Sequence, residues 1–253
     1  GIAAAARGGG VALLVAVAIT QAVVAVSWIL ATSLPGRNGA FLILAMAAAG
    51  ADVTVSVWPH GKLGTLLAVF ALAIPVMFVH QLARAAARVR VTDSLGAIAF
   101  GVIAVVALPA LIQLRHEFIS PSVGGKVVAA VAASAAGALV VGYLVDLVMP
   151  APRFDPAVPR GLLAVITSAG VGGSIGHLAL HANSGFVNGR GAFVGAAVGT
   201  LAAFFAIAAA FVESSTPVPT GAFARRLRPV LAAVVPIALL SPVAFLLCLA
   251  IRA

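Results

Sequence analysis

Asp52 is the carboxylate that lies deepest inside an apolar run of this chain, in the stretch AAAGADVTVSVW. An ionised side chain is expensive in a hydrocarbon interior, so such residues usually carry protons, bind cations or pair with a neighbouring group. Asp52 is therefore a candidate for carrying a proton or holding a cation. The competing interpretation is an aspartate near the membrane interface that bonds to Thr54, Ser56 or a neighbouring helix. The sequence leaves both open.

Two histidines and a run of glycines have spacings that resemble chemical motifs. His177 and His181 are four residues apart, which would place them on one face of a helix, as in some metal sites. A third ligand is not evident and the glutamate of an HExxH motif is absent, so we predict no metal site and no cofactor. The stretch GVGGSIG, residues 170–176, follows no predicted strand and lies in an apolar run. We expect it to serve close helix packing rather than phosphate binding.

Arginines gather in two polar segments that interrupt the apolar sequence. Arg153 and Arg160 lie in PAPRFDPAVPR, and Arg225, Arg226 and Arg228 lie in AFARRLRP. A guanidinium group binds phosphate oxygens through paired N–H donors. We therefore predict that these five arginines line a site for the phosphate of an anionic lipid headgroup. The alternative is that they only anchor helix ends at an anionic membrane surface.

The apolar runs between these residues identify the class of protein. The chain has 253 residues, of which 63% are hydrophobic and 8% are charged, whereas soluble domains are about one quarter charged. A helix needs roughly 20 mostly apolar residues to cross the hydrocarbon core. We predict an all-α, polytopic integral membrane protein with one transmembrane domain, residues 1–253. Because the sequence begins with Gly1 rather than Met, we expect that an N-terminal segment can precede it. The eight predicted spans are residues 9–33, 40–58, 64–83, 94–114, 127–149, 161–182, 191–213 and 229–251.

The distribution of Lys and Arg predicts an orientation in the membrane. Of the 15 such residues, nine lie in the loops after the first, third, fifth and seventh spans, and six lie on the other side. Cytoplasmic loops carry the excess of positive charge. We therefore expect a multi-pass protein of the inner (plasma) membrane, with Arg153 and Arg160 in a cytoplasmic loop. Attraction to anionic lipid accounts for the net charge of +9, so no nucleic-acid partner is predicted.

The segment from residue 134 to residue 160, SAAGALVVGYLVDLVMPAPRFDPAVPR, resembles the CDP-diacylglycerol synthase (phosphatidate cytidylyltransferase) family of membrane enzymes. Bacterial members carry a helix pattern like S-D-T-G-A-Y-x-x-G and then a loop like A-P-x-x-S-P-x-K-x-x-E-G. Further on, AFVES resembles their G-D-x-x-E-S segment. The resemblance implies a CDP-diacylglycerol synthase-like fold of membrane helices. The positions of this chain that match the family patterns are Ser134, Gly137, Gly142, Pro152, Pro156, Glu213 and Ser214.

This chain departs from the family pattern at the positions of the catalytic residues. The family helix has Asp and Thr where this chain has Ala135 and Ala136, and the Asp of G-D-x-x-E-S is Ala210. In the family's closing D-R-x-D-S pattern, the two Asp positions are Arg225 and Arg228. Cytidylyl transfer joins two polyanions and depends on divalent cations that carboxylates hold. The resemblance therefore implies a relative that has lost its metal ligands and its catalytic residues.

Three function classes follow from these observations. The first, which we favour, is a non-catalytic relative of CDP-diacylglycerol synthase that binds anionic phospholipid or scaffolds a partner in envelope or lipid metabolism, with a protein partner or a second copy of itself. The second is an active enzyme with a metal site rebuilt from Asp52, Asp146, Asp155 and Glu213. The third is a small transporter or channel subunit, whose path Asp52 would mark together with the prolines at 75 and 109.

Overall fold

A computed structural model describes residues 1–32, 36–84, 91–118, 120–149, 151–155, 158–180, 189–214 and 222–252 of the chain. Nearly all of this length is helical, and one short hairpin interrupts it. The elements are α1 (Ile2–Gly8), α2 (Gly10–Thr32), α3 (Arg37–Val57), α4 (Lys62–Ala83), α5 (Val91–Ala107), α6 (Ala110–His116), α7 (Pro121–Val148), β1 (Arg153–Asp155), β2 (Val158–Gly161), α8 (Leu162–Leu180), α9 (Arg190–Ser214) and α10 (Ala222–Arg252).

Within the described residues, eight helical segments are long and apolar enough to cross a membrane. They coincide with the eight predicted spans to within a few residues at each end, apart from longer starts to the fifth and eighth. Many outward side chains are large and apolar, such as Leu72, Leu147 and Leu178, as expected for surfaces that face lipid rather than water. The chain is an all-α, multi-pass membrane protein, and this prediction from the sequence is confirmed.

The fourth span differs from the prediction because it consists of two helices. α5 ends at Ala107 and α6 begins at Ala110, with Pro109 between them. Proline has no N–H, so the carbonyl of Val105, four residues earlier, loses its usual helical donor. The amide Nε2 of Gln21 on α2 donates to that carbonyl instead, at 3.0 Å. A side chain from a neighbouring span therefore satisfies the break in the middle of the membrane.

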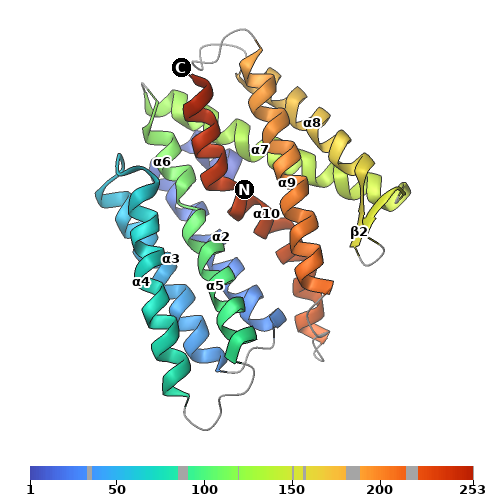
Figure 1. The fold of residues 1–253 in the computed structure, drawn as a ribbon. Helices are drawn as coiled ribbons and strands as arrows, with labels where there is room; N and C mark the ends of the chain where they lie inside the picture. Colours follow the sequence, from blue (N-terminus) through green and yellow to red (C-terminus); the bar gives the residue numbers. More distant parts are fainter. Residues whose placement is uncertain are drawn as a thin grey trace.

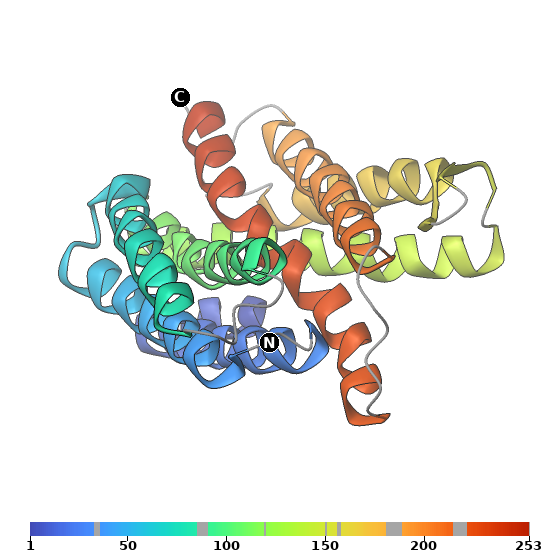
Figure 2. The same ribbon diagram turned by 60° about the horizontal axis from the view of Figure 1, so that its bottom comes forward.

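Two groups of helices flank α10. The α2, α3, α4 and α5 helices pack together on one side, and α7, α8 and α9 pack on the other (Figure 1). Helix α10 contacts α2 and α5 in the first group and α7 and α9 in the second, and it runs between the groups in the turned view (Figure 2). Phe245 of α10, which is 1% exposed, belongs to the core that joins them.

Helices α8 and α9 approach each other through glycines. A Cβ atom added at Gly172 would overlap the carbonyl oxygen of Gly195, and one added at Gly176 would overlap that of Gly191. Small residues four apart on both helices allow this approach, as in other membrane helix pairs. The prediction that the glycine run serves helix packing is confirmed for Gly172 and Gly176.

The segment between α7 and α8 forms a hairpin that the sequence analysis placed in a loop. β1 and β2 pair antiparallel, with Arg153 opposite Gly161. The strands contain three and four residues, and the prolines and charges around them gave no alternating apolar pattern that would indicate a strand. The hairpin is a small projection at the end of the helix pair α7 and α8 (Figure 1).

Candidate functional site

The first turns of α10 carry three arginines beside the end of a membrane span. Arg225 and Arg226 are exposed, and Arg228 is partly buried. Positions 225 and 228 are three residues apart, which places them on one face of the helix. Positive charge is unfavourable near a helix N-terminus, and α10 has no acidic residue in its first turn. This end of α10 therefore favours a bound anion.

The hairpin places a further arginine outside the helices. Arg153 on β1 is exposed. The backbone N–H of Gly161 donates to Asp146 Oδ1 on α7 at 2.8 Å, and the N–H of Leu162 donates to the carbonyl of Pro152 at 3.0 Å. These bonds fix the base of the hairpin to the ends of α7 and α8. Arg160 belongs to β2, but its side chain lies outside the described part of the structure, as does Pro156 altogether.

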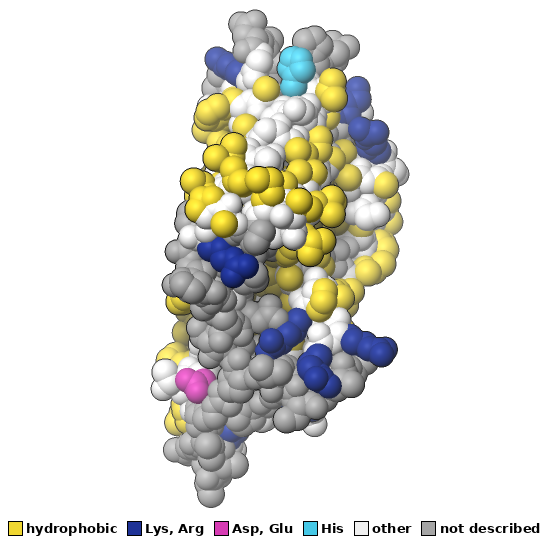
Figure 3. Space-filling view, turned by 90° about the vertical axis from the view of Figure 1, so that its right-hand side faces the viewer, with side chains coloured by type: hydrophobic (Ala, Val, Ile, Leu, Met, Phe, Trp, Pro, Cys, Tyr) yellow, Lys and Arg dark blue, Asp and Glu magenta, His cyan; other side chains and the backbone are white. Residues whose placement is uncertain are grey.

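The arginines lie toward one end of the molecule. Figure 3 shows the side of the molecule that carries the hairpin, where Lys and Arg side chains lie both above and below a band of hydrophobic side chains, with a group of them below it. The exposed arginines of the described chain at this end are Arg37, Arg153, Arg225 and Arg226. A band of apolar surface bordered by guanidinium groups is the pattern of a membrane boundary against anionic headgroups.

The helix positions that match the family pattern have packing roles. Ser134 Oγ donates to the carbonyl of Gly172 at 3.2 Å, which ties α7 to α8. A Cβ atom at Gly142 would lie 2.7 Å from Ser168 Oγ, and one at Gly137 would collide with Ile175. All three residues face α8. The packing of α7 against α8 therefore explains why a serine and two glycines occur at positions 134, 137 and 142, without any role in catalysis.

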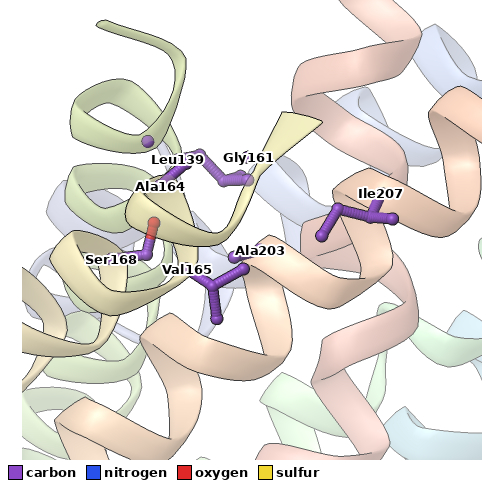
Figure 4. Close-up of a pocket in the computed structure, with 8 residues that line it drawn as sticks. Leu139, Gly161, Ala164, Val165, Ser168, Ala203 and Ile207 are labelled. Atoms are coloured by element: carbon purple, nitrogen blue, oxygen red, sulfur yellow. The ribbon is translucent and has the colours of Figure 1, made fainter. Parts of the chain in front are cut away.

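A small pocket lies where α7, α8, α9 and the hairpin meet (Figure 4). Its volume of about 10 Å³ has room for about one water molecule, and its lining is mostly apolar. Ser168 points its hydroxyl to the carbonyl of Ala138 at 2.8 Å. A nucleotide does not fit in this pocket. Glu213 and Ser214 end α9, and their side chains lie outside the described part of the structure.

The carboxylates considered for a rebuilt metal site do not all come together. Asp52 belongs to α3, whereas Asp146 lies at the hairpin end of α7, in the other group of helices (Figure 1). The side chains of Asp155 and Glu213 are not described. Over the described residues, no group of three or more His, Cys, Asp or Glu side chains is placed to hold a metal ion. A site that combined Asp52 with Asp146 is excluded by this arrangement.

His177 lies in the last turn of α8. His177 is exposed and lies beside an open groove between α8 and α9, which Gly170, Gly173 and Phe193 also line. His181 lies outside the described residues. The pairing predicted from their spacing therefore stays a hypothesis.

Asp52 lies against α2, where the side chain of Gln21 hydrogen-bonds to its carboxyl group. The hydroxyls of Thr54 and Ser56 do not serve the carboxyl, because they donate to the backbone carbonyls of Gly50 and Asp52 at 2.6 and 2.7 Å. Asp52 Oδ1 is buried and has no hydrogen-bond partner in the described chain, and the same holds for Gln21 Oε1. Two oxygen acceptors without donors therefore occur on neighbouring helices inside the membrane span.

Gln21 is the residue of this site that sequence reasoning missed. It is 1% exposed and lies in the middle of α2, which is otherwise almost wholly apolar. The available signal was a lone glutamine at the centre of a span, together with a proline in another span that would leave a carbonyl without a donor.

Comparison with known proteins adds no family. No family model, no curated protein and no solved structure matches this chain. The resemblance to CDP-diacylglycerol synthases stays a prediction from sequence.

Proposed function

We propose that this protein binds anionic phospholipid at the cytoplasmic side of the plasma membrane, as a non-catalytic relative of CDP-diacylglycerol synthase. Arg225, Arg226 and Arg228 are the core of the proposed site, and Arg153 and Arg160 of the hairpin complete it. The single observation that carries this proposal is the exposed arginine pair in the first turns of α10, where the helix has no acidic residue.

The chemistry of that position selects a phosphate. The N-terminal end of a helix bears partial positive charge, and each arginine there costs on the order of 0.3–1 kcal/mol when nothing compensates it. A phosphate oxygen accepts hydrogen bonds from a guanidinium fork and offsets both positive charges. The candidate membrane span of α10 begins at Arg225, so the three arginines lie at the end of that span, where lipid phosphates would meet them.

The proposed orientation follows from the same charges. By sequence, nine of the 15 Lys and Arg residues fall in the loops of this side, among them Arg37 and Arg84 besides those of the site. Lys and Arg are enriched in cytoplasmic loops, and the cytoplasmic leaflet is the anionic one. The lipid site and the excess of positive charge therefore belong to the same side of the membrane.

The absence of turnover is part of the proposal. Arginine at positions 225 and 228 cannot ligate Mg²⁺ and would repel it. Alanines at 135 and 136 supply no carboxylate or hydroxyl to a reacting phosphate. The pocket where α7, α8, α9 and the hairpin meet has room for about one water molecule, so this pocket does not accommodate a nucleotide. In this proposal, a partner protein in envelope or lipid metabolism would recognise the bound lipid.

The test compares lipid binding by the purified protein and by an arginine variant. Nanodiscs of phosphatidylcholine, with or without phosphatidate or phosphatidylglycerol, are used to measure thermal unfolding, because a bound lipid stabilises the folded state by mass action. We expect anionic lipid to raise the Tm of the native protein and of an Arg190→Ala control. We expect the rise to be largely lost in Arg225→Gln/Arg226→Gln, whose side chains are exposed.

Equal stabilisation of the double variant and the native protein would overturn the proposal. A parallel assay with phosphatidate, CTP and Mg²⁺ tests the absence of turnover. Formation of CDP-diacylglycerol above an empty-vector preparation, with an active family member as positive control, would replace the proposal with an enzyme whose metal site is rebuilt.

A further inference from the structure

The orientation of the Gln21 amide is fixed by the break in the fourth span. The carbonyl of Val105 has no helical donor, because the residue four positions later is Pro109. Gln21 Nε2 donates to this carbonyl at 3.0 Å, and Gln21 is almost completely buried. Reversing the amide would place two oxygen acceptors against each other, so Nε2 must face Val105. The oxygen Oε1 is therefore directed elsewhere in the same interior.

Gln21 hydrogen-bonds to the carboxyl of Asp52, but one oxygen of each side chain still lacks a donor. Gln21 Oε1 and Asp52 Oδ1 are both buried without a hydrogen-bond partner in the described residues, and Gln21 is the polar side chain beside Asp52. An unsatisfied buried acceptor costs about 1–3 kcal/mol, and a carboxylate costs more. A hydrogen between the two oxygens would satisfy both at once.

We propose that Asp52 binds a proton inside the membrane and, in its protonated form, donates the new O–H to Gln21 Oε1. The reaction is the addition of one proton to the Asp52 carboxylate, with no other bond formed or broken. The pair Asp52 and Gln21 is then a reversible proton-binding site between α3 and α2. This proposal does not depend on lipid binding at α10.

The charges around Asp52 favour a proton over an ionised carboxylate. Helix α3 packs against α2, α4 and α5. Helix α2 has no ionisable side chain, and α5 has Asp93 alone, in its first turn. The ionisable residues of α4 are Lys62 and His80, near its two ends. Lys62 begins α4, across the turn that follows α3, so it is the cation whose influence the experiment has to exclude.

A metal ion fits this place less well than a proton. Na⁺ and other hard cations take about six oxygen ligands or more. The pair supplies Gln21 Oε1 and Asp52 Oδ1, and the nearby carbonyl of Val105 already accepts from Gln21. A single proton needs only the two oxygen acceptors that are present.

The test uses dicyclohexylcarbodiimide, an apolar reagent that adds to protonated carboxyl groups within membranes. Full-length protein in proteoliposomes is treated at a series of pH values, and adducts are located by mass spectrometry. We expect an adduct on Asp52 at neutral pH that falls at least tenfold at strongly alkaline pH. The Asp52→Asn variant should lose it, whereas Lys62→Gln should keep it. Absence of the adduct at every pH, with a reactive membrane protein in the same vesicles as control, would overturn the proposal.

A second measurement separates proton binding from a structural role. The amide of Asp52→Asn can donate to Gln21 Oε1 as the protonated acid does, so this variant should be as stable as the native protein at neutral pH. Its stability should also not fall at alkaline pH, where the native protein loses the proton. Asp52→Leu leaves Gln21 Oε1 unsatisfied and should be less stable than Asp52→Asn at both pH values. Parallel pH profiles of the native protein and Asp52→Asn would contradict the proposal.

Discussion

The phenolic hydroxyl of Tyr143 on α7 donates a hydrogen bond of 2.8 Å to the backbone carbonyl of Ala232 on α10. Pro236 lies four residues after Ala232 within the same helix, so this carbonyl has no helical donor of its own. The same relation connects Gln21 with the carbonyl of Val105, four residues before Pro109. At these two places, a polar side chain from another helix replaces the donor that a proline removes, and it thereby binds the helices to each other.

The Tyr143→Phe variant should therefore unfold more easily than the native protein. It keeps the ring but removes the donor to Ala232, and we expect a loss of about 1–2 kcal/mol in the free energy of unfolding. Unfolding in mixed micelles with increasing SDS measures the change.

The control is a double-mutant cycle with Pro236→Ala. Alanine at 236 supplies the missing N–H to the carbonyl of Ala232, so the cost of Tyr143→Phe should shrink in that background. An unchanged cost would show that the effect of Tyr143 comes from packing and not from the freed carbonyl.

The spans could be predicted from the sequence because length and hydropathy decide them, and a helix is the structure that satisfies its own backbone in lipid. The division of the fourth span was harder, since a proline within a membrane helix is compatible with continuation, as at Pro75 in α4. At Pro109 the freed carbonyl of Val105 is satisfied by Gln21 on another helix, and the local sequence does not show such a tertiary contact.

The candidate sites show the same division between local pattern and tertiary packing. The unusual position of Asp52 could be recognised from the apolar residues around it, but its partner Gln21 could not, because the two lie on different helices. The arginines of α10 were expected in the loop before the eighth span, whereas they lie in the first turns of α10, whose span begins at Arg225. The matches at Ser134 and Gly142 are explained by contacts of α7 with α8 that the local motif could not show.

The close approach of α8 and α9 should not tolerate a methyl group. In Gly172→Ala, the new Cβ would meet the backbone of Gly195 and Gly199, which cannot move without separating the helices. Overpacking of this kind costs roughly 1–3 kcal/mol. We expect a lower Tm and less folded protein in the membrane fraction.

Gly170→Ala is the matched control on the same helix, because no atom lies within 4 Å of the Cβ that it would add. Alanine is the better helix former by about 1 kcal/mol, so this variant should be neutral or slightly stabilised. Equal losses in Gly170→Ala and Gly172→Ala would contradict the close contact with α9.

The carboxyl of Asp146 should control the order of the hairpin that carries Arg153. Its Oδ1 accepts from the backbone N–H of Gly161. Asp146→Leu removes the acceptor, and loss of about 1 kcal/mol of local stability would accelerate amide hydrogen exchange in the hairpin by roughly fivefold. Asp146→Asn keeps an oxygen at the same position, so its exchange should stay closer to that of the native protein. Faster exchange in both variants to the same extent would mean that the charge of Asp146, and not this hydrogen bond, orders the hairpin.

The proposed orientation predicts which exposed positions a membrane-impermeant maleimide reaches in intact cells. Cys248 is 0% exposed and is the single cysteine of the sequence, so the native protein should give little background. Lys126 and Arg226 are exposed near the starts of α7 and α10, which are the fifth and eighth spans, so these two starts lie on opposite sides of the membrane. We expect Lys126→Cys to react in intact cells and Arg226→Cys to react only after the membrane is opened, because the arginine-rich end faces the cytoplasm. The reverse pattern would place the arginines of α10 on the outer side. The anionic cytoplasmic leaflet would then no longer supply their ligand, and the proposed lipid site would have to be abandoned with the orientation.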